Sequence, residues 1–299
     1  MITFIQNFKV CKVKSIALSL VVFAIFLTGN GTSAQNVSFG MLTDVHYAAI
    51  KDNGTRKYSQ SLDKITQCID TMNQTKVGFL IEMGDFKDMP VPPDSEAALG
   101  FLGKVETAFS RFRGDRYHVL GNHDEDCISK SQFYSIAKNS HISQKRSYYS
   151  FQKGGYTFVV LDACFDSTSV PYDRGHFEWS DANVPVQELK WLENELGHSN
   201  KPVIVFVHQL LYGNSKVTIK NAASVRNILE ESKKVKCVFH GHDHKGGYER
   251  INGIHYYTLK GMVEGNFPES NSFALVSLAK DSIRIKGYGN AVSMSLPIY

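Results

Sequence analysis

The nine residues "FHGHDHKGG" (239–247) place three histidines within five positions, directly after the apolar run "VKCVF" (235–239). A short run rich in valine and phenylalanine predicts a buried β-strand that ends where the histidines begin. Imidazoles crowded against glycines serve no obvious packing purpose. From this stretch alone two interpretations are open, a metal site or a polar turn that is rich in histidine, and the rest of the chain decides between them.

Similar apolar runs recur along the chain, at 37–43, 77–82, 117–120, 156–162 and 203–207. Between them, apolar residues spaced by threes and fours predict amphipathic helices within 58–73, 99–112 and 185–196. Two later segments, 248–259 and 273–289, each contain two β-like runs around a turn, at Asn252-Gly253 and Lys280-Asp281. We therefore expect one α/β domain with α+β character near its C-terminal end.

The first 34 residues have the order of a secretory signal peptide. Lysines at positions 9, 12 and 14 precede the apolar run "SIALSLVVFAIFL" (15–27), and the small residues of "TSA" end at Ala34. The run is too short to span a membrane comfortably, although an uncleaved N-terminal anchor is the alternative. No cysteine follows it directly, which argues against a lipid anchor. We expect export to the periplasm or out of the cell, leaving residues 35–299 as a single domain.

Cleavage after Ala34 would leave 299 − 34 = 265 residues and lower the formal charge from +4 to +1, because three lysines and no acids are lost. A nearly neutral protein gives no electrostatic reason to expect nucleic acid or an anionic membrane as a partner. Cys68, Cys127, Cys164 and Cys237 remain, and in an exported protein they can form disulfides. Cys127 and Cys164 both follow strand ends and are the predicted pair, with buried free thiols as the alternative. The oligomeric state is left open.

Polar side chains collect where the predicted strands end. "DVH" (44–46), "GDFKD" (84–88), "GNHDE" (121–125), His208 and "GHDH" (241–244) each follow an apolar run. Any one of them alone is typical of a turn or of a buried core histidine. Because ligands bind at the carboxyl ends of strands in α/β sheets, the repeated pattern predicts that these side chains converge in space.

The donors in these clusters suit two metal ions. They are Asp44, His46, Asp85, Asn122, His208, His242 and His244. Carboxylate, amide and imidazole ligands without a thiolate favour Mn²⁺, Fe or Zn²⁺ over soft metals. Seven donors exceed what one tetrahedral zinc needs and fit two metals that share a bridging carboxylate. The histidines of "GHDH" therefore complete a predicted dinuclear site.

These motifs in this order, D-x-H, G-D-x-x-D, G-N-H-D/E, a lone His and G-H-x-H, resemble the calcineurin-like metallophosphoesterase superfamily. All five are present, over about residues 38–277. The resemblance implies two packed mixed β-sheets flanked by helices, the metallo-dependent phosphatase fold. It implies a first metal held by Asp44, His46, Asp85 and His244, and a second held by Asp85, Asn122, His208 and His242, with Asp85 bridging. It further implies that His123 faces the substrate phosphate or leaving oxygen, oriented by Asp124, and that Asp88 supports the site.

A narrower similarity concerns "GTRKYSQSL" (54–62) and "GHDHKGGYERINGIHYYTLKGMVE" (241–264). Both resemble the manganese-dependent ADP-ribose/CDP-alcohol diphosphatase branch, which often carries D-x-Q where this chain has "DVH". The similarity favours manganese and phosphodiester or pyrophosphate substrates of nucleotide or alcohol type. The expected reaction is in-line attack on phosphorus by a metal-bound hydroxide, with no Ser or Cys nucleophile.

Two other functions remain open at this stage. An alkaline-phosphatase-like phosphomonoesterase would use the same metal centre, and a non-catalytic binding module on a degenerate scaffold would have lost ligands, of which none is missing here. The loops 48–58 and 164–184 are expected to decide the leaving group. Arg56 and Arg174 lie in these loops and are candidate phosphate or nucleotide contacts, with a role as ordinary surface arginines as the alternative. The partner we expect is a small phosphate ester.

Overall fold

Two six-stranded β-sheets lie at the centre of the computed structural model, which describes residues 37–143 and 146–298. The first sheet has the order β12-β11-β10-β1-β2-β3. Its strands are β1 (Val37–Leu42), β2 (Phe79–Glu82), β3 (Asp115–His118), β10 (Ser272–Leu278), β11 (Ser282–Gly289) and β12 (Met294–Pro297). The expected signal peptide, residues 1–34, lies outside the described residues.

The second sheet has the order β4-β5-β6-β7-β9-β8. Its strands are β4 (Tyr149–Lys153), β5 (Tyr156–Val160), β6 (Val203–Phe206), β7 (Val235–His240), β8 (Gly247–Ile251) and β9 (Ile254–Thr258). Both sheets mix parallel and antiparallel pairs, since β1 runs parallel to β2 but antiparallel to β10, and β6 runs parallel to β7 while β8 and β9 form a hairpin.

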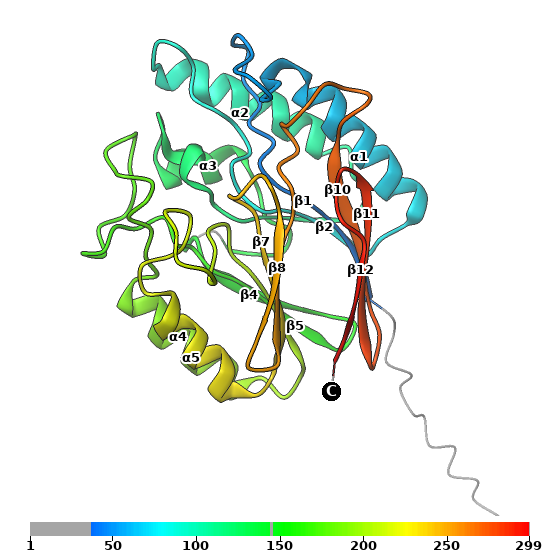
Figure 1. The fold of residues 1–299 in the computed structure, drawn as a ribbon. Helices are drawn as coiled ribbons and strands as arrows, with labels where there is room; N and C mark the ends of the chain where they lie inside the picture. Colours follow the sequence, from blue (N-terminus) through cyan, green and yellow to red (C-terminus); the bar gives the residue numbers. More distant parts are fainter. Residues whose placement is uncertain (1–36, 144–145, 299) are drawn as a thin grey trace, which may run out of the picture. The chain divides into compact units, whose positions relative to one another are not determined.

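Helices cover the outer face of each sheet (Figure 1). The first sheet packs against α1 (Ser61–Thr75), α2 (Ser95–Phe109) and α3 (Lys130–Ile136), and the second against α4 (Val186–His198) and α5 (Ala222–Ser232). Two 3₁₀ turns, η1 (Tyr58–Gln60) and η2 (Asn122–Glu125), interrupt the loops. The expected fold of two mixed sheets flanked by helices is confirmed. Among the described residues, no helix combines the length and apolar character needed to cross a membrane.

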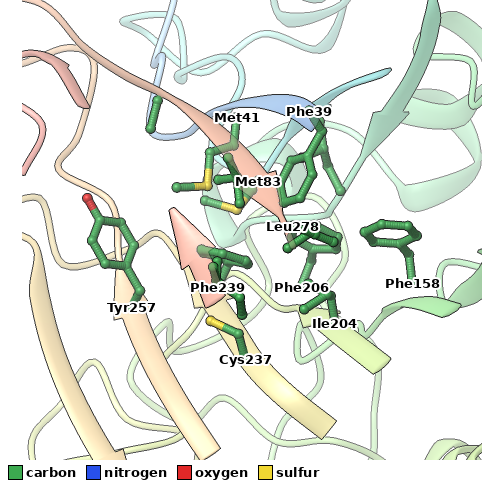
Figure 2. Close-up of a cluster of buried hydrophobic side chains, with 14 of the residues drawn as sticks. Phe39, Met41, Met83, Phe158, Ile204, Phe206, Cys237, Phe239, Tyr257 and Leu278 are labelled. Carbon is green, nitrogen blue, oxygen red and sulfur yellow. The ribbon is translucent and has the colours of Figure 1, made fainter. Parts of the chain in front are cut away.

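The core between the sheets is rich in aromatic side chains (Figure 2). Phe39 of β1 stacks on Phe79 of β2 with ring centroids 4.8 Å apart and meets Phe206 of β6 edge-on at 5.6 Å. The alternate residues Leu42 and Leu80 pack against the helices instead. Because both faces of these strands are buried, their sequences are continuous apolar runs rather than alternating ones.

The predicted Cys127–Cys164 disulfide is wrong. All four cysteines of the described residues are free thiols, and all are buried. The Sγ of Cys164 lies 3.7 Å from the carbonyl oxygen of Leu120 and 3.5 Å from Nε2 of Gln209, so polar neighbours other than a second sulfur surround it. Burial raises the pKa of both thiols, which keeps them protonated and unreactive.

A buried ion pair lies beneath the strand ends. The ring of His118 is fully buried, with Nε2 3.2 Å from Glu106 Oε2 and Nδ1 3.4 Å from Glu82 Oε2. Burial by itself lowers the pKa of His118, but Glu106 and Glu82 outweigh it and raise the pKa to about 9. The imidazolium therefore pairs with the carboxylate of Glu106, while burial raises the pKa of Glu82 to about 8, which keeps that carboxyl mostly protonated at neutral pH.

We expect His118→Leu to lower the free energy of unfolding by about 3–5 kcal/mol, because it leaves the buried carboxylate of Glu106 without its cation. Urea unfolding followed by circular dichroism measures the change. The matched control is His141→Leu, which removes a histidine that is 79% exposed and 3.1 Å from Asp115. An exposed pair of this kind contributes about 0–1 kcal/mol. Equal unfolding midpoints for the two variants would contradict the prediction.

Candidate metal centre

The strand ends of both sheets bring a first group of three donors together. Asp44 and His46 follow β1, and His244 follows β7. Nε2 of His244 lies 3.2 Å from Asp44 Oδ1 and 3.1 Å from Nε2 of His46. One donor atom from each of the three residues lies within 4.8 Å of the others, a spacing that could hold a metal ion.

A second group consists of Asp85, His208 and His242, whose donor atoms also lie within 4.8 Å of one another. Oδ2 of Asp85 lies 3.1 Å from Nε2 of His208 and 3.5 Å from Nε2 of His46 in the first group. Asp85 therefore lies between the groups, where a bridging ligand belongs. Asn122 is next to this group, because the backbone N–H of His123 donates to Oδ1 of Asp85 at 2.8 Å.

Four of the seven predicted ligands have a buried donor atom without a hydrogen-bond partner. These atoms are Asp44 Oδ1, Asn122 Oδ1, His208 Nε2 and His242 Nε2. A buried polar atom left without a partner is destabilising by about 1–3 kcal/mol, so native proteins seldom keep several in one place. Bound cations would satisfy all four, and the residues present thus fit two divalent metal ions.

The backbone at the predicted ligands is strained. Asp44, His46, Asp85 and His242 have φ angles of 51°, 46°, 57° and 66°, in a region that residues with a side chain seldom adopt. The loops hold one another in this conformation, since the N–H of Asp44 donates to Gly84 O at 3.0 Å and that of His46 to Asp85 O at 2.9 Å. Strain of this kind is typical of functional sites.

Two glycines of the motifs allow the loops to approach one another. A Cβ at Gly121 would overlap the backbone nitrogen and carboxylate of Asp85, and a Cβ at Gly241 would overlap the hydroxyl of Thr43. Any side chain at either position would push a predicted ligand loop away from the centre. The glycines of "GNH" and "GH" are thus required by close packing.

Each of three histidines in the centre is anchored through its other ring nitrogen. Nδ1 of His46 donates to Asp88 Oδ2 at 2.9 Å, and Nδ1 of His208 donates to the carbonyl of Met83 at 2.8 Å. Nδ1 of His244 donates to Glu264 Oε1 at 2.6 Å, and this hydrogen bond lowers the pKa of Glu264 to about 2. These partners leave Nε2 as the nitrogen that faces the centre.

The support by Asp88 is confirmed, whereas Glu264 was not foreseen from the sequence. Glu264 lies 20 residues beyond His244. The β8–β9 hairpin separates them, and only the return of the chain after β9 brings the carboxylate back. In the sequence, Glu264 ends the segment "GMVE" and does not directly follow an apolar run, so no strand-end signal marks it.

The prediction that Asp124 orients His123 is wrong. Nδ1 of His123 lies 2.7 Å from Asp126 Oδ2 and 3.6 Å from Asp88 Oδ1. Asp124 instead accepts backbone N–H groups, from Asp85 at 3.0 Å and from the neighbouring loop residues Phe86 and Gly121 at 2.9 Å. In the 3₁₀ turn η2, residues three apart share a side, so Asp126 meets His123 while Asp124 points inward. Asp124 thus links the loop that carries Asp85 to the loop that carries Gly121 and Asn122.

The charges in the centre are strongly coupled. Burial raises the pKa of Asp85 and of Asp44, but the surrounding imidazoles outweigh it and hold both well below their usual values. Burial likewise lowers the pKa of His208 and His244, but Asp85 and Asp44 raise them to about 10 and about 9. Burial lowers the pKa of His242 to about 3. A metal ion must displace protons from His208 and His244, so metal affinity falls as the pH falls.

Two packed mixed sheets with a pair of Asp/His donor groups at the strand ends define a metallo-dependent phosphatase fold. Residues 37–246 match the model of the calcineurin-like phosphoesterase family, and the chain belongs to that family. It is a metallophosphoesterase, a hydrolase that acts on phosphate esters.

Known relatives cover most of the chain. A manganese-dependent ADP-ribose/CDP-alcohol diphosphatase of Oryza sativa subsp. japonica is 28% identical over 295 residues, which are 84% of this chain and 90% of the relative. A protein of the same name from Bos taurus is 25% identical, over 86% of this chain and 93% of its own. The crystal structure of a dimetal phosphatase from Danio rerio superposes with a TM-score of 0.77 at 23% identity, covering 88% of this chain and 99% of that one. That likeness shows the fold.

Proposed function

We propose that this chain is a manganese-dependent hydrolase of phosphodiester or pyrophosphate bonds in substrates that carry a nucleotide or alcohol group. The observation that carries the proposal is the pair of donor groups that meet at Asp85, with four buried donor atoms lacking partners. The choice of metal and of substrate class is supported by relatives named manganese-dependent ADP-ribose/CDP-alcohol diphosphatases.

We assign the first ion to Asp44, His46, Asp85 and His244, and the second to Asp85, Asn122, His208 and His242. Two divalent cations, when bound, polarise the phosphoryl oxygens and lower the pKa of a coordinated water to about 7. Among the described residues, Cys127 and Cys164 are buried and their thiols are protonated, so we assign neither of them as a nucleophile.

His123 is assigned to the leaving oxygen. Its ring lies edge-on to that of His46 with centroids 4.8 Å apart, and 28% of its side chain is exposed, so it lies at the mouth of the centre. Asp126 fixes Nδ1, which leaves Nε2 to meet a substrate. An Nε2–H that donates to the leaving oxygen offsets the negative charge that develops as the bond to phosphorus breaks.

Arg56 is assigned to a second phosphate or to a non-bridging oxygen. Its backbone pairs with that of Glu264, the partner of His244, which places it at the rim of the first donor group. Burial lowers the pKa of Arg56, but Tyr58 and the charges of Asp88 and Asp85 outweigh it and raise the pKa further. A permanent cation here favours substrates with more than one phosphate, because a guanidinium binds phosphate oxygens in a bidentate manner.

The proposal is tested with a substrate panel in the presence of Mn²⁺: ADP-ribose, a CDP-alcohol, a cyclic nucleotide, a glycerophosphodiester and a phosphomonoester. We expect the highest kcat/KM for ADP-ribose or the CDP-alcohol. Faster turnover of the monoester than of every other substrate would make the chain a phosphomonoesterase. Binding of metal without hydrolysis of any of them would make it a binding module.

Export is a separate part of the proposal. It rests on the lysines at 9, 12 and 14, the apolar run 15–27 and the small residues at Thr32 and Ala34. We expect N-terminal sequencing of exported protein to begin at Gln35. An intact Met1 on protein recovered from membranes would contradict this prediction and support the uncleaved anchor.

A further inference from the structure

Trp179 is a large aromatic residue that remains exposed beside the metal centre. It keeps 40% of its surface open to solvent, while its ring centroid lies 5.7 Å from that of His242 in an edge-to-face arrangement. His242 belongs to the second donor group. An indole that contacts a proposed ligand and still presents apolar surface to water is a candidate contact for substrate.

The loop that carries Trp179 is held in place. The N–H of Gly175 donates to Glu125 O at 2.9 Å, which ties the loop to the turn η2. The rings of Tyr172 and Phe177 stack with centroids 4.1 Å apart, and Tyr172 is only 1% exposed. These two aromatics therefore serve the packing of the loop.

Packing does not account for Trp179 in the same way. Phe165, a further aromatic of this loop, is covered by the ammonium group of Lys130 at 3.7 Å. Trp179 contacts the ring of His242 and still keeps 40% of its surface open to solvent. Its position is fixed before any substrate arrives, so little conformational entropy is lost when a planar group stacks on it.

We propose that Trp179 is a specificity-determining residue that stacks on the nucleobase of a substrate whose phosphate lies at the metal centre. The inference rests on the proposed function and narrows its substrate class to nucleotide-bearing esters over alcohol esters without a planar group. Stacking on an aromatic side chain tolerates any base, because every base has a π-face. The residue would therefore favour adenine and cytosine nucleotides alike.

Binding is tested by fluorescence, because the chain has two tryptophans, Trp179 and Trp191. Trp191 lies on α4 and packs on Tyr148 at 4.9 Å. In Trp191→Phe protein with Mn²⁺, we expect AMP to change the emission of Trp179 saturably and ribose 5-phosphate, which lacks the base, to leave it unchanged. In the matched Trp179→Phe protein neither compound should change the emission of Trp191. An equal response to both compounds in Trp191→Phe, or no response to AMP, overturns the inference.

Kinetics separates this inference from the proposed function. We expect Trp179→Ala to raise KM for ADP-ribose about 10-fold or more and to change KM for glycerophosphocholine little. Trp191→Phe serves as the control and should change neither KM value. If the wild-type chain hydrolyses neither substrate, the proposed function fails while the fluorescence result still decides on stacking. If Trp179→Ala raises KM equally for both substrates, the stacking role is wrong and Trp179 only packs on His242.

Discussion

Asp85→Ala is expected to lose bound metal and hydrolytic activity together. Its carboxylate lies 3.1 Å from Nε2 of His208 and 3.5 Å from Nε2 of His46, so one side chain serves both donor groups. Two divalent cations at close range repel each other strongly, and a shared carboxylate offsets part of that repulsion. Without it we expect turnover to fall to background, and metal analysis after gel filtration to give less than half of the wild-type content.

Two further variants make this result interpretable. Asp85→Asn keeps the shape of the side chain but removes its charge, and should also lose metal while remaining folded by circular dichroism. Asp115→Ala removes an aspartate at the opposite end of the same sheet, where it pairs with Lys153 at 2.7 Å, and should keep both metal and activity. Full metal content in Asp85→Asn and Asp85→Ala would show that Asp85 is not the bridging ligand.

Strands buried on both faces could be predicted from single apolar runs, and the hairpins β8–β9 and β10–β11 from paired β-like runs around a turn, although β8 is largely exposed. β1, β2, β6 and β7 lie between the inter-sheet core and a layer of helices, so their sequences are continuous apolar runs. β4 and β12 were missed, because each is an edge strand with several partly or fully exposed residues and needs no such run. α3 has only 7 residues, too few to establish a helical period.

The metal ligands could be predicted from their position directly after a strand, whereas the groups that support them could not. A polar residue directly after a buried strand must lie at the carboxyl end of that strand. This constraint placed Asp44, Asp85 and His208 in one predicted site. The partner of His123 depends on the turn that follows the strand, and a 3₁₀ turn selects Asp126 over Asp124. Such a choice follows from the local backbone conformation, which the residue types alone do not determine.

His123→Ala is expected to keep near-normal metal content while its turnover falls by about 10²-fold or more. Donor atoms of His123, His46 and Asp88 also lie within 4.8 Å of one another, but Nδ1 of His123 is bound to Asp126 and Nδ1 of His46 to Asp88, and we assign this group no metal. The loss of His123 should therefore remove chemistry and leave intact the two donor groups that meet at Asp85. Metal analysis beside kcat on one preparation measures both quantities. Metal loss equal to that in Asp85→Ala would mean that the ligands are misassigned.

The role of His123 as an acid makes a sharper prediction about leaving groups. A poor leaving oxygen, such as that of an alkyl alcohol, needs a proton or a strong hydrogen bond as the bond to phosphorus breaks, whereas nitrophenolate leaves without one, as does the phosphate monoester released from a pyrophosphate. The loss of turnover in His123→Ala should therefore be smaller for a nitrophenyl diester than for a glycerophosphodiester. Asp126→Asn should show the same ordering with a smaller loss, because Nε2 remains present but its ring is less firmly oriented and less basic. An equal loss for good and poor leaving groups would contradict the acid role, and His123 would then act by orienting the phosphate.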